Sequence, residues 1–168
     1  KLLKFLESQK ELIELIMFID TSTIFKDNSL CGVKFRLKRL KMCPYSVDNE
    51  RIGNFRSFLA LHKDSLDHLD IGYVDADIAE LLNQFYQLSS LVFDKNFPEN
   101  FTKTDKIRVL RVKRYNHDLS HQFPFIKTLF ILFNTEILID LSNYKHLETL
   151  TVALSTLQKL KIPQNVKN

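Results

Sequence analysis

Three side chains near the centre of the sequence have residue types that can hold a metal ion. His117, Asp118 and His121 have the spacing of one helical face, and imidazole and carboxylate groups are common zinc ligands. Pro124 follows closely and disfavours a stable helix at this place. No further zinc ligand lies nearby in the sequence. We therefore expect no metal site here.

An acidic stretch between residues 64 and 80 is the second set of candidate ligands. It comprises Asp64, Asp67, Asp70, Asp75, Asp77 and Glu80. The stretch lacks the spacing and the glycine of a calcium-binding loop, so we interpret it as a solvated surface with some charges at a helix start. Asp77 is placed to cap a helix that begins at Ile78.

The sequence shows no recognisable catalytic nucleophile. Serine and histidine are present, but no serine is flanked by glycines as in a strand-to-helix nucleophile turn. Three glycines in 168 residues are also too few for a phosphate-binding loop and the usual tight turns. We expect a protein that is not an enzyme and that needs no cofactor.

A six-residue pattern recurs along the whole chain and predicts the elements that position the side chains. It consists of an apolar residue, two variable residues, leucine, one variable residue and an apolar residue. It starts at Leu12, Leu37, Leu66, Leu88, Ile107, Ile126, Leu147 and Leu157, at spacings of 25, 29, 22, 19, 19, 21 and 10 residues. The leucine and the last apolar residue share one face of a β-strand, so stacked units predict a parallel sheet. We expect one buried row of Leu40, Leu69, Leu91, Leu110, Leu129 and Leu150.

The segments between these strands predict a mixture of helices and turns. Apolar residues at near-helical spacing predict helices over 1–10, 54–63 and 77–85. The connections 113–125 and 132–146 are less regular and predict single turns or loops. The last spacing is too short for a full repeat, so segments 147–152 and 157–162 form a terminal hairpin, or one of them is a false match.

The pattern resembles the leucine-rich repeat superfamily over most of the chain. The asparagine expected three residues after each strand is present only as Asn96, Asn134 and Asn165, so the repeats are irregular. Segments 5–10, 58–63, 123–129 and 144–150 are similar to the repeat region of F-box proteins. The resemblance implies an α/β solenoid over residues 1–168, with a curved parallel sheet and with helices and loops on its convex side.

The same resemblance implies a function. F-box proteins are substrate adaptors of Skp–cullin ubiquitin ligases, so we expect a protein–protein interaction domain that recognises substrates. No F-box is visible in the 168 residues, and the chain begins at Lys1. We therefore expect a fragment of a longer protein that contacts ligase subunits through a segment outside this chain.

A second function remains open, a ligand-binding leucine-rich repeat ectodomain of a secreted or membrane receptor. The glycosylation sequon Asn100-Phe101-Thr102 is compatible with it. The only cysteines, Cys31 and Cys43, do not form the paired caps of such ectodomains, and reduced thiols in a cytosolic protein explain them more simply. The sequence has no apolar run long enough for a transmembrane helix, and we expect a cytoplasmic or nuclear protein.

Two basic clusters point to the surface that binds the partner. One surrounds the predicted strand of the motif that starts at Leu37, and the other surrounds the strand of the motif that starts at Ile107. Residues that alternate with the buried leucines belong to the concave face of the predicted solenoid. On it we place Arg39, Lys41, His68, Asp70, Val92, Arg111, Lys113 and Phe130. This mixture predicts two positive bands and an acidic protein partner, whereas nucleic acid favours a more uniform basic stripe with aromatic residues.

Overall fold

The computed structural model describes residues 2–17, 30, 33–42, 49–72, 74–94, 98, 104–115, 118–134, 138–153 and 159–166. The helices are α1 (Leu2–Ser8), α3 (Asn49–Ala60) and α4 (Ala76–Leu82). The strands are β1 (Glu14–Met17), β2 (Arg39–Met42), β3 (His68–Ile71), β4 (Ser90–Phe93), β5 (Val109–Tyr115), β6 (Thr128–Asn134), β7 (Leu138–Asp140), β8 (Thr149–Val152) and β9 (Lys159–Lys161).

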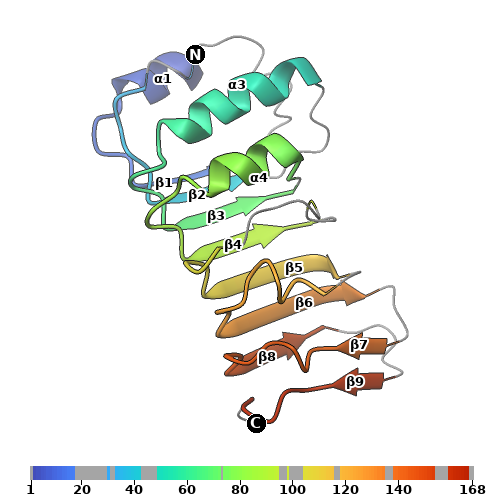
Figure 1. Cartoon of the computed structure of the whole chain (residues 1–168). Coiled ribbons are helices and arrows are strands. Elements are labelled where there is room, and N and C mark those ends of the chain that lie inside the picture. Colours follow the sequence, from blue (N-terminus) through green and yellow to red (C-terminus); the bar gives the residue numbers. More distant parts are fainter. Residues whose placement is uncertain are drawn as a thin grey trace.

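Seven of these strands form one sheet, and the fold is α/β. The strand order is β1-β2-β3-β4-β5-β6-β8, and every neighbouring pair is parallel. Sequence order and spatial order therefore agree from the N-terminal to the C-terminal edge of the sheet, as Figure 1 shows. Parallel pairing requires that the chain return to the same end of the sheet between successive strands.

The register of the sheet aligns the motif leucines across all seven strands. Leu15 is the partner of Leu40, and the row continues through Leu69, Leu91, Leu110, Leu129 and Leu150. The five from Leu40 to Leu129 are buried, whereas Leu150 on the edge strand β8 is only partly buried. The predicted leucine row is thus confirmed for five members, and the sixth is less buried because β8 has no further neighbour on its outer side in the described sheet.

The backbone repeats the same pair of hydrogen bonds before six strands of the main sheet, β2 to β6 and β8. Two successive N–H groups donate to a single carbonyl oxygen of the preceding unit, as Lys38 and Arg39 do to Ile13. The accepting carbonyls belong to Ile13, Lys38, Asp67, Ser89, Arg108 and Lys127, with N···O distances of 2.8–3.1 Å. These positions recur with the spacing of the sequence motif. The units therefore repeat in backbone geometry and not only in composition.

The core lies on one side of the sheet, between the leucine row and the helices. Helix α3 contributes Phe55, Phe58 and Leu59, and α4 contributes Ile78, Ala79 and Leu82. In the C-terminal half, the described connections contribute Leu119, Phe123, Leu141 and Tyr144 instead. Figure 1 shows α3 and α4 together on this side of the sheet. Since one face of the sheet is covered by core residues, the charged residues of the strands gather on the opposite face.

The helices lie where the sequence predicts them, with shifted ends and a different cap. The predicted helix over 54–63 begins earlier, at Asn49, and ends at Ala60. The expectation that Asp77 caps the third helix is wrong. Asp75 is the N-cap, and its carboxylate accepts a hydrogen bond from the backbone N–H of Ile78 at 2.7 Å. Asp77 lies in the first turn and pairs with Arg56 of α3.

The C-terminal segment does not form the predicted terminal hairpin, and the alternative that one of its two motifs is a false match agrees with the strand pairing. Strand β8 belongs to the main sheet, whereas β9 pairs with β7 in a separate two-stranded parallel sheet. The motif at 157–162 is therefore a false match for the main sheet, although Leu157 itself lies outside the described residues. Strand β7 also corrects the expectation that 132–146 holds only turns and loops.

Candidate functional site

The side of the sheet opposite the leucine row carries two continuous rows of side chains, which we call the outer face. One row comprises Glu14, Arg39, His68, Ser90, Val109, Thr128 and Thr149. The other comprises Ile16, Lys41, Asp70, Val92, Arg111, Phe130 and Thr151. Successive residues of a strand point to opposite faces, so the residues on either side of each buried leucine belong to this surface.

The structure brings the predicted concave-face residues together on the outer face. Seven of the eight are members of the two rows: Arg39, Lys41, His68, Asp70, Val92, Arg111 and Phe130. The eighth, Lys113, lies two residues after Arg111 on β5 and reaches the carboxylate of Asp94 at 4.0 Å. The outer face thus gathers charged, hydroxyl and aromatic groups from strands that lie far apart in the sequence.

Two of these residues are more buried than the sequence analysis assumes. Val92 is 3% exposed and Asp70 is 7% exposed, so neither is an open contact on the outer face. Val92 stands between Asp70 and Arg111 in the register, and neighbouring strands are about 5 Å apart, so longer side chains on both sides can screen it. Val92, which the sequence analysis places on the partner-binding face, therefore lies on that face but offers little exposed surface to a partner.

The two predicted positive bands are also partly neutralised. The ammonium group of Lys41 lies 3.5 Å from the carboxylate of Asp70, and that of Lys113 lies 4.0 Å from Asp94. Arg39 and Arg111 are both exposed and have no ion pair with a carboxylate in the described part of the chain. Among the described residues of this face, the positive charge without an ion pair therefore resides on Arg39 and Arg111.

His68 stands near the middle of the outer face. Its Nδ1 atom lies 2.8 Å from the hydroxyl oxygen of Ser90 on the next strand. Partial burial lowers the pKa of His68 below its ordinary value, as do the charges of Arg39 and Arg111, while Asp70 and Asp67 act in the opposite direction. His68 is therefore neutral at physiological pH and can exchange hydrogen bonds with a ligand.

Arg111 is held in place by an aromatic neighbour. Its guanidinium carbon lies 4.6 Å from the ring centroid of Phe130, which is within the range of a cation–π interaction. The planar guanidinium group donates through several N–H groups and suits carboxylate or phosphate acceptors. Sequence reasoning missed the hydroxyl groups of Ser90, Thr128, Thr149 and Thr151, although their position next to the motif leucines is the signal that finds them.

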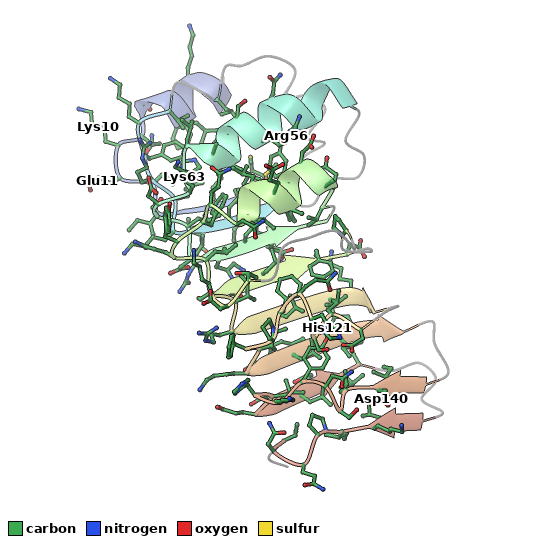
Figure 2. The ribbon with its side chains drawn as sticks, in the orientation of Figure 1. Lys10, Glu11, Arg56, Lys63, His121 and Asp140 are labelled. Atoms are coloured by element: carbon green, nitrogen blue, oxygen red, sulfur yellow. The ribbon has the colours of Figure 1, made fainter. Side chains whose placement is uncertain are left out.

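The remaining candidate ligands do not converge. Asp118 accepts hydrogen bonds from Ser120 and from the side-chain amide of Asn143, while His121 is exposed. Figure 2 shows His121 and Asp140 in the C-terminal half. In the described residues, no three His, Cys, Asp or Glu side chains form a group that could hold a metal ion. His117, Cys31, Cys43 and the sequon at 100–102 lie outside the described residues.

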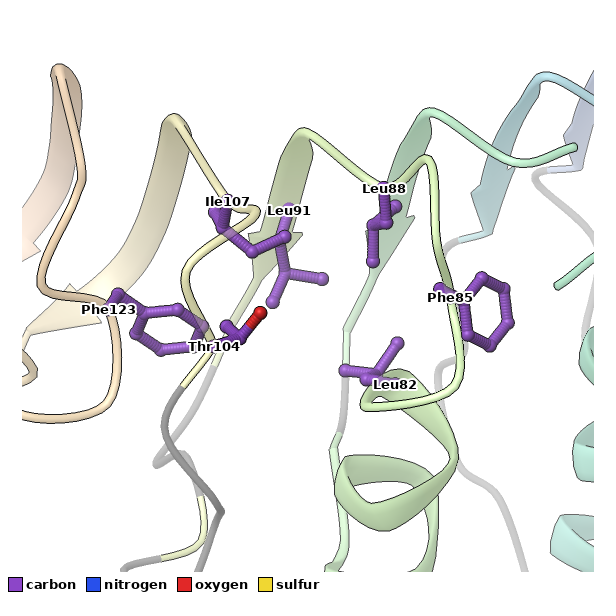
Figure 3. A pocket seen from close by; sticks show the side chains of 7 residues that line it. All are labelled: Leu82, Phe85, Leu88, Leu91, Thr104, Ile107 and Phe123. Atoms are coloured by element: carbon purple, nitrogen blue, oxygen red, sulfur yellow. The ribbon is translucent and has the colours of Figure 1, made fainter. Parts of the chain in front are cut away.

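A small pocket lies between the end of α4 and the start of β5. It is lined by Leu82, Phe85, Leu88, Leu91, Thr104, Ile107 and Phe123. Figure 3 shows these side chains around the hollow, where Thr104 carries the only oxygen drawn. The lining contains no titratable group, so the pocket offers neither an acid nor a base for catalysis.

Comparison of the chain with models of known protein families, with curated proteins and with solved structures gave no match. None of the helices in the described ranges combines the length and apolar character needed to cross a membrane.

Proposed function

We propose that this chain is a leucine-rich repeat solenoid whose outer face binds another protein. The repeated backbone hydrogen bonds and the aligned leucine row support the repeat architecture. In such an array each unit contacts mainly its neighbours, and the side chains of successive strands build an extended binding surface.

The observation that carries this proposal is the composition of the outer face. Arg111, Phe130 and Thr151 occupy the neighbouring strands β5, β6 and β8 in register, with the arginine and the threonine exposed and the phenylalanine half-buried. The other exposed arginine of this face, Arg39, lies on β2. Arginine and aromatic residues are enriched where proteins recognise one another, and hydroxyl groups supply adaptable hydrogen bonds. In contrast, the titratable groups of this face are spread over several strands, and Lys41 and Lys113 are already paired with carboxylates, which favours binding over catalysis.

We further propose that the partner is a substrate of a Skp–cullin ubiquitin ligase, with this chain as the recognition part of an F-box adaptor. This step rests on the resemblance of segments such as 58–63 and 144–150 to F-box repeat regions. In this arrangement the ligase subunits bind a segment outside the 168 residues, and the protein works in the cytoplasm or the nucleus.

The test is purification of the longer protein from cells, followed by quantitative mass spectrometry of its partners. The variant Arg111→Glu changes the outer face, and Arg56→Glu makes the same change on α3, on the core side of the sheet. We expect Arg111→Glu to lose the recognised proteins, Arg56→Glu to keep them, and both variants to keep the ligase subunits. Consistent absence of ligase subunits from the unchanged protein would overturn the adaptor role. If Arg111→Glu retained every partner, the proposal that the outer face recognises them would be refuted.

A further inference from the structure

Some charged side chains of the outer face are in ion pairs and others are not. Its aspartates Asp70 and Asp94 are already in ion pairs with Lys41 and Lys113. Glu14 stands beside Arg39 in the register of β1 and β2, but the two side chains form no ion pair. Arg39 and Arg111 are therefore left as exposed cations without an ion pair to a carboxylate in the described ranges. A partner that buries them has to supply acceptors, because buried charges without partners are costly.

The two arginines are separated by three strand steps, from β2 to β5. Adjacent strands are about 4.8 Å apart, so the arginine positions are roughly 15 Å apart across the sheet. Between them His68 and Ser90 are linked at 2.8 Å. An extended peptide advances about 3.3 Å per residue, so acidic residues about five positions apart can reach both arginines.

From this geometry we infer that the occupant of the outer face is an acidic segment of the partner protein, which places one carboxylate at Arg39 and His68 and another at Arg111. This inference rests on the proposed function and specifies the chemistry of its partner. The segment runs across the strands, and its carboxylates accept N–H donors from the guanidinium groups. The aromatic ring of Phe130 supports the Arg111 guanidinium from one side and leaves its edge for the ligand.

His68 makes this interaction sensitive to pH. The charged groups around it are Arg39 and Lys41 on β2, Asp67 and Asp70 from its own segment, and Arg111 on β5, while the hydroxyl of Ser90 on β4 contacts it. In the free protein the pKa of His68 is lowered, mainly by partial burial. A carboxylate placed beside the imidazole favours its charged form. Binding then takes up a proton, and affinity rises as the pH falls toward about 6.

The observations favour an acidic protein segment over a nucleic acid. Strings of phosphates are best matched by a uniform basic stripe with stacking aromatics. The outer face instead alternates cations with the paired carboxylates of Asp70 and Asp94 and with threonine hydroxyls. The lone aromatic side chain of its two described rows, Phe130, is already covered by Arg111.

The test is a nuclear magnetic resonance titration of the ¹⁵N-labelled 168-residue chain. The probe is a glycine–serine peptide with two glutamates about five residues apart, and the control peptide has glutamine at both places. We expect amide shifts at Arg39, His68, Ser90 and Arg111, and affinity at least about tenfold higher for the glutamate peptide. Arg39→Gln or Arg111→Gln should each weaken binding about threefold to tenfold, and Arg56→Gln on α3 should leave it unchanged.

Equal affinities for the two peptides would overturn the inference, as would unchanged binding in both arginine variants. Tighter binding of a uridine oligomer than of the glutamate peptide would do the same, since it would assign the face to nucleic acid. If the affinity for the glutamate peptide did not rise as the pH is lowered from about 7.5 to about 6, the proposed role of His68 would be refuted. If these results occur while Arg111→Glu still loses its partners in cells, the face binds protein by other chemistry, and only the acidic segment is refuted.

Discussion

The backbone N–H of Leu37 donates a hydrogen bond to Nδ1 of His62 at 3.3 Å, across 25 residues of sequence. The carbonyl of the same leucine accepts a hydrogen bond from the hydroxyl of Ser65 at 2.8 Å. Leu37 starts the second motif, and its two backbone polar groups are thus satisfied by side chains that follow α3. The His62 ring itself stacks on Phe35 and meets the edge of Phe58.

The burial of His62 predicts that the fold loses stability in acid. The side chain is fully buried, and this burial, together with the nearby charge of Arg36, lowers its pKa from 6.5 to about 4. The unfolded chain therefore binds more protons than the folded chain as the pH falls from 6.5 toward about 4. The contribution of the neutral His62 ring to stability is therefore complete above pH 6.5 and is lost as the pH falls toward about 4. We expect a loss of about 3 kcal/mol across the window from this group.

The measurement is urea unfolding of the unchanged chain and of His62→Gln at several pH values. Glutamine keeps an acceptor for the Leu37 N–H group but does not titrate, so its free energy of unfolding should fall less steeply in acid. The difference between the two curves isolates His62 from the carboxylates that titrate in the same range. Parallel curves would refute this role of the histidine.

The leucine row predicts a graded set of destabilisations. Leu110 is fully buried on the inner strand β5, so Leu110→Ala should lower the free energy of unfolding by about 2–5 kcal/mol. Leu150 is only partly buried on β8, and Leu150→Ala should cost less, below about 2 kcal/mol. Chemical denaturation of both variants gives the comparison. A cost for Leu150→Ala equal to that for Leu110→Ala would mean that the sheet edge at β8 is covered.

The N-cap residue of α4 is Asp75 in the structure, whereas the sequence predicts Asp77. Asp75→Ala removes the acceptor of the Ile78 N–H group and should cost about 1 kcal/mol. Asp77→Ala removes an exposed ion pair with Arg56, which is worth less than about 1 kcal/mol. We expect the first variant to have the lower midpoint in a thermal melt. The opposite order would restore Asp77 as the cap.

Much of the main sheet can be predicted from the six-residue motif. Motif leucines spaced 19–29 residues apart become register partners on neighbouring parallel strands, where their side chains share one buried row. The same alternation correctly places Arg39 and Arg111 on the opposite face. The motif at 157–162 misleads because a short apolar alternation fits any strand, and β9 finds its partner in β7.

The burial and charge pairing of outer-face residues depend on cross-strand neighbours that lie far apart in the sequence. Val92 is buried between its register neighbours Asp70 on β3 and Arg111 on β5. Lys41 forms an ion pair because Asp70 is its register partner. The role of His62 cannot be predicted from the sequence, because it depends on a hydrogen bond to Leu37, a residue 25 positions away. The N-cap at Asp75 is two residues from the predicted position, a usual uncertainty for helix ends.

The central claim, protein recognition by the outer face, is tested most directly by photo-crosslinking in cells. A photoreactive phenylalanine analogue replaces either Thr151, an exposed residue of the outer face, or Glu80, an exposed residue of α4 on the core side of the sheet. Irradiation followed by mass spectrometry identifies the proteins attached at each position. We predict a specific crosslinked protein from position 151 that Arg111→Glu abolishes, and none in common from position 80. Crosslinks to the same partner from position 80, with none from position 151, would contradict the claim.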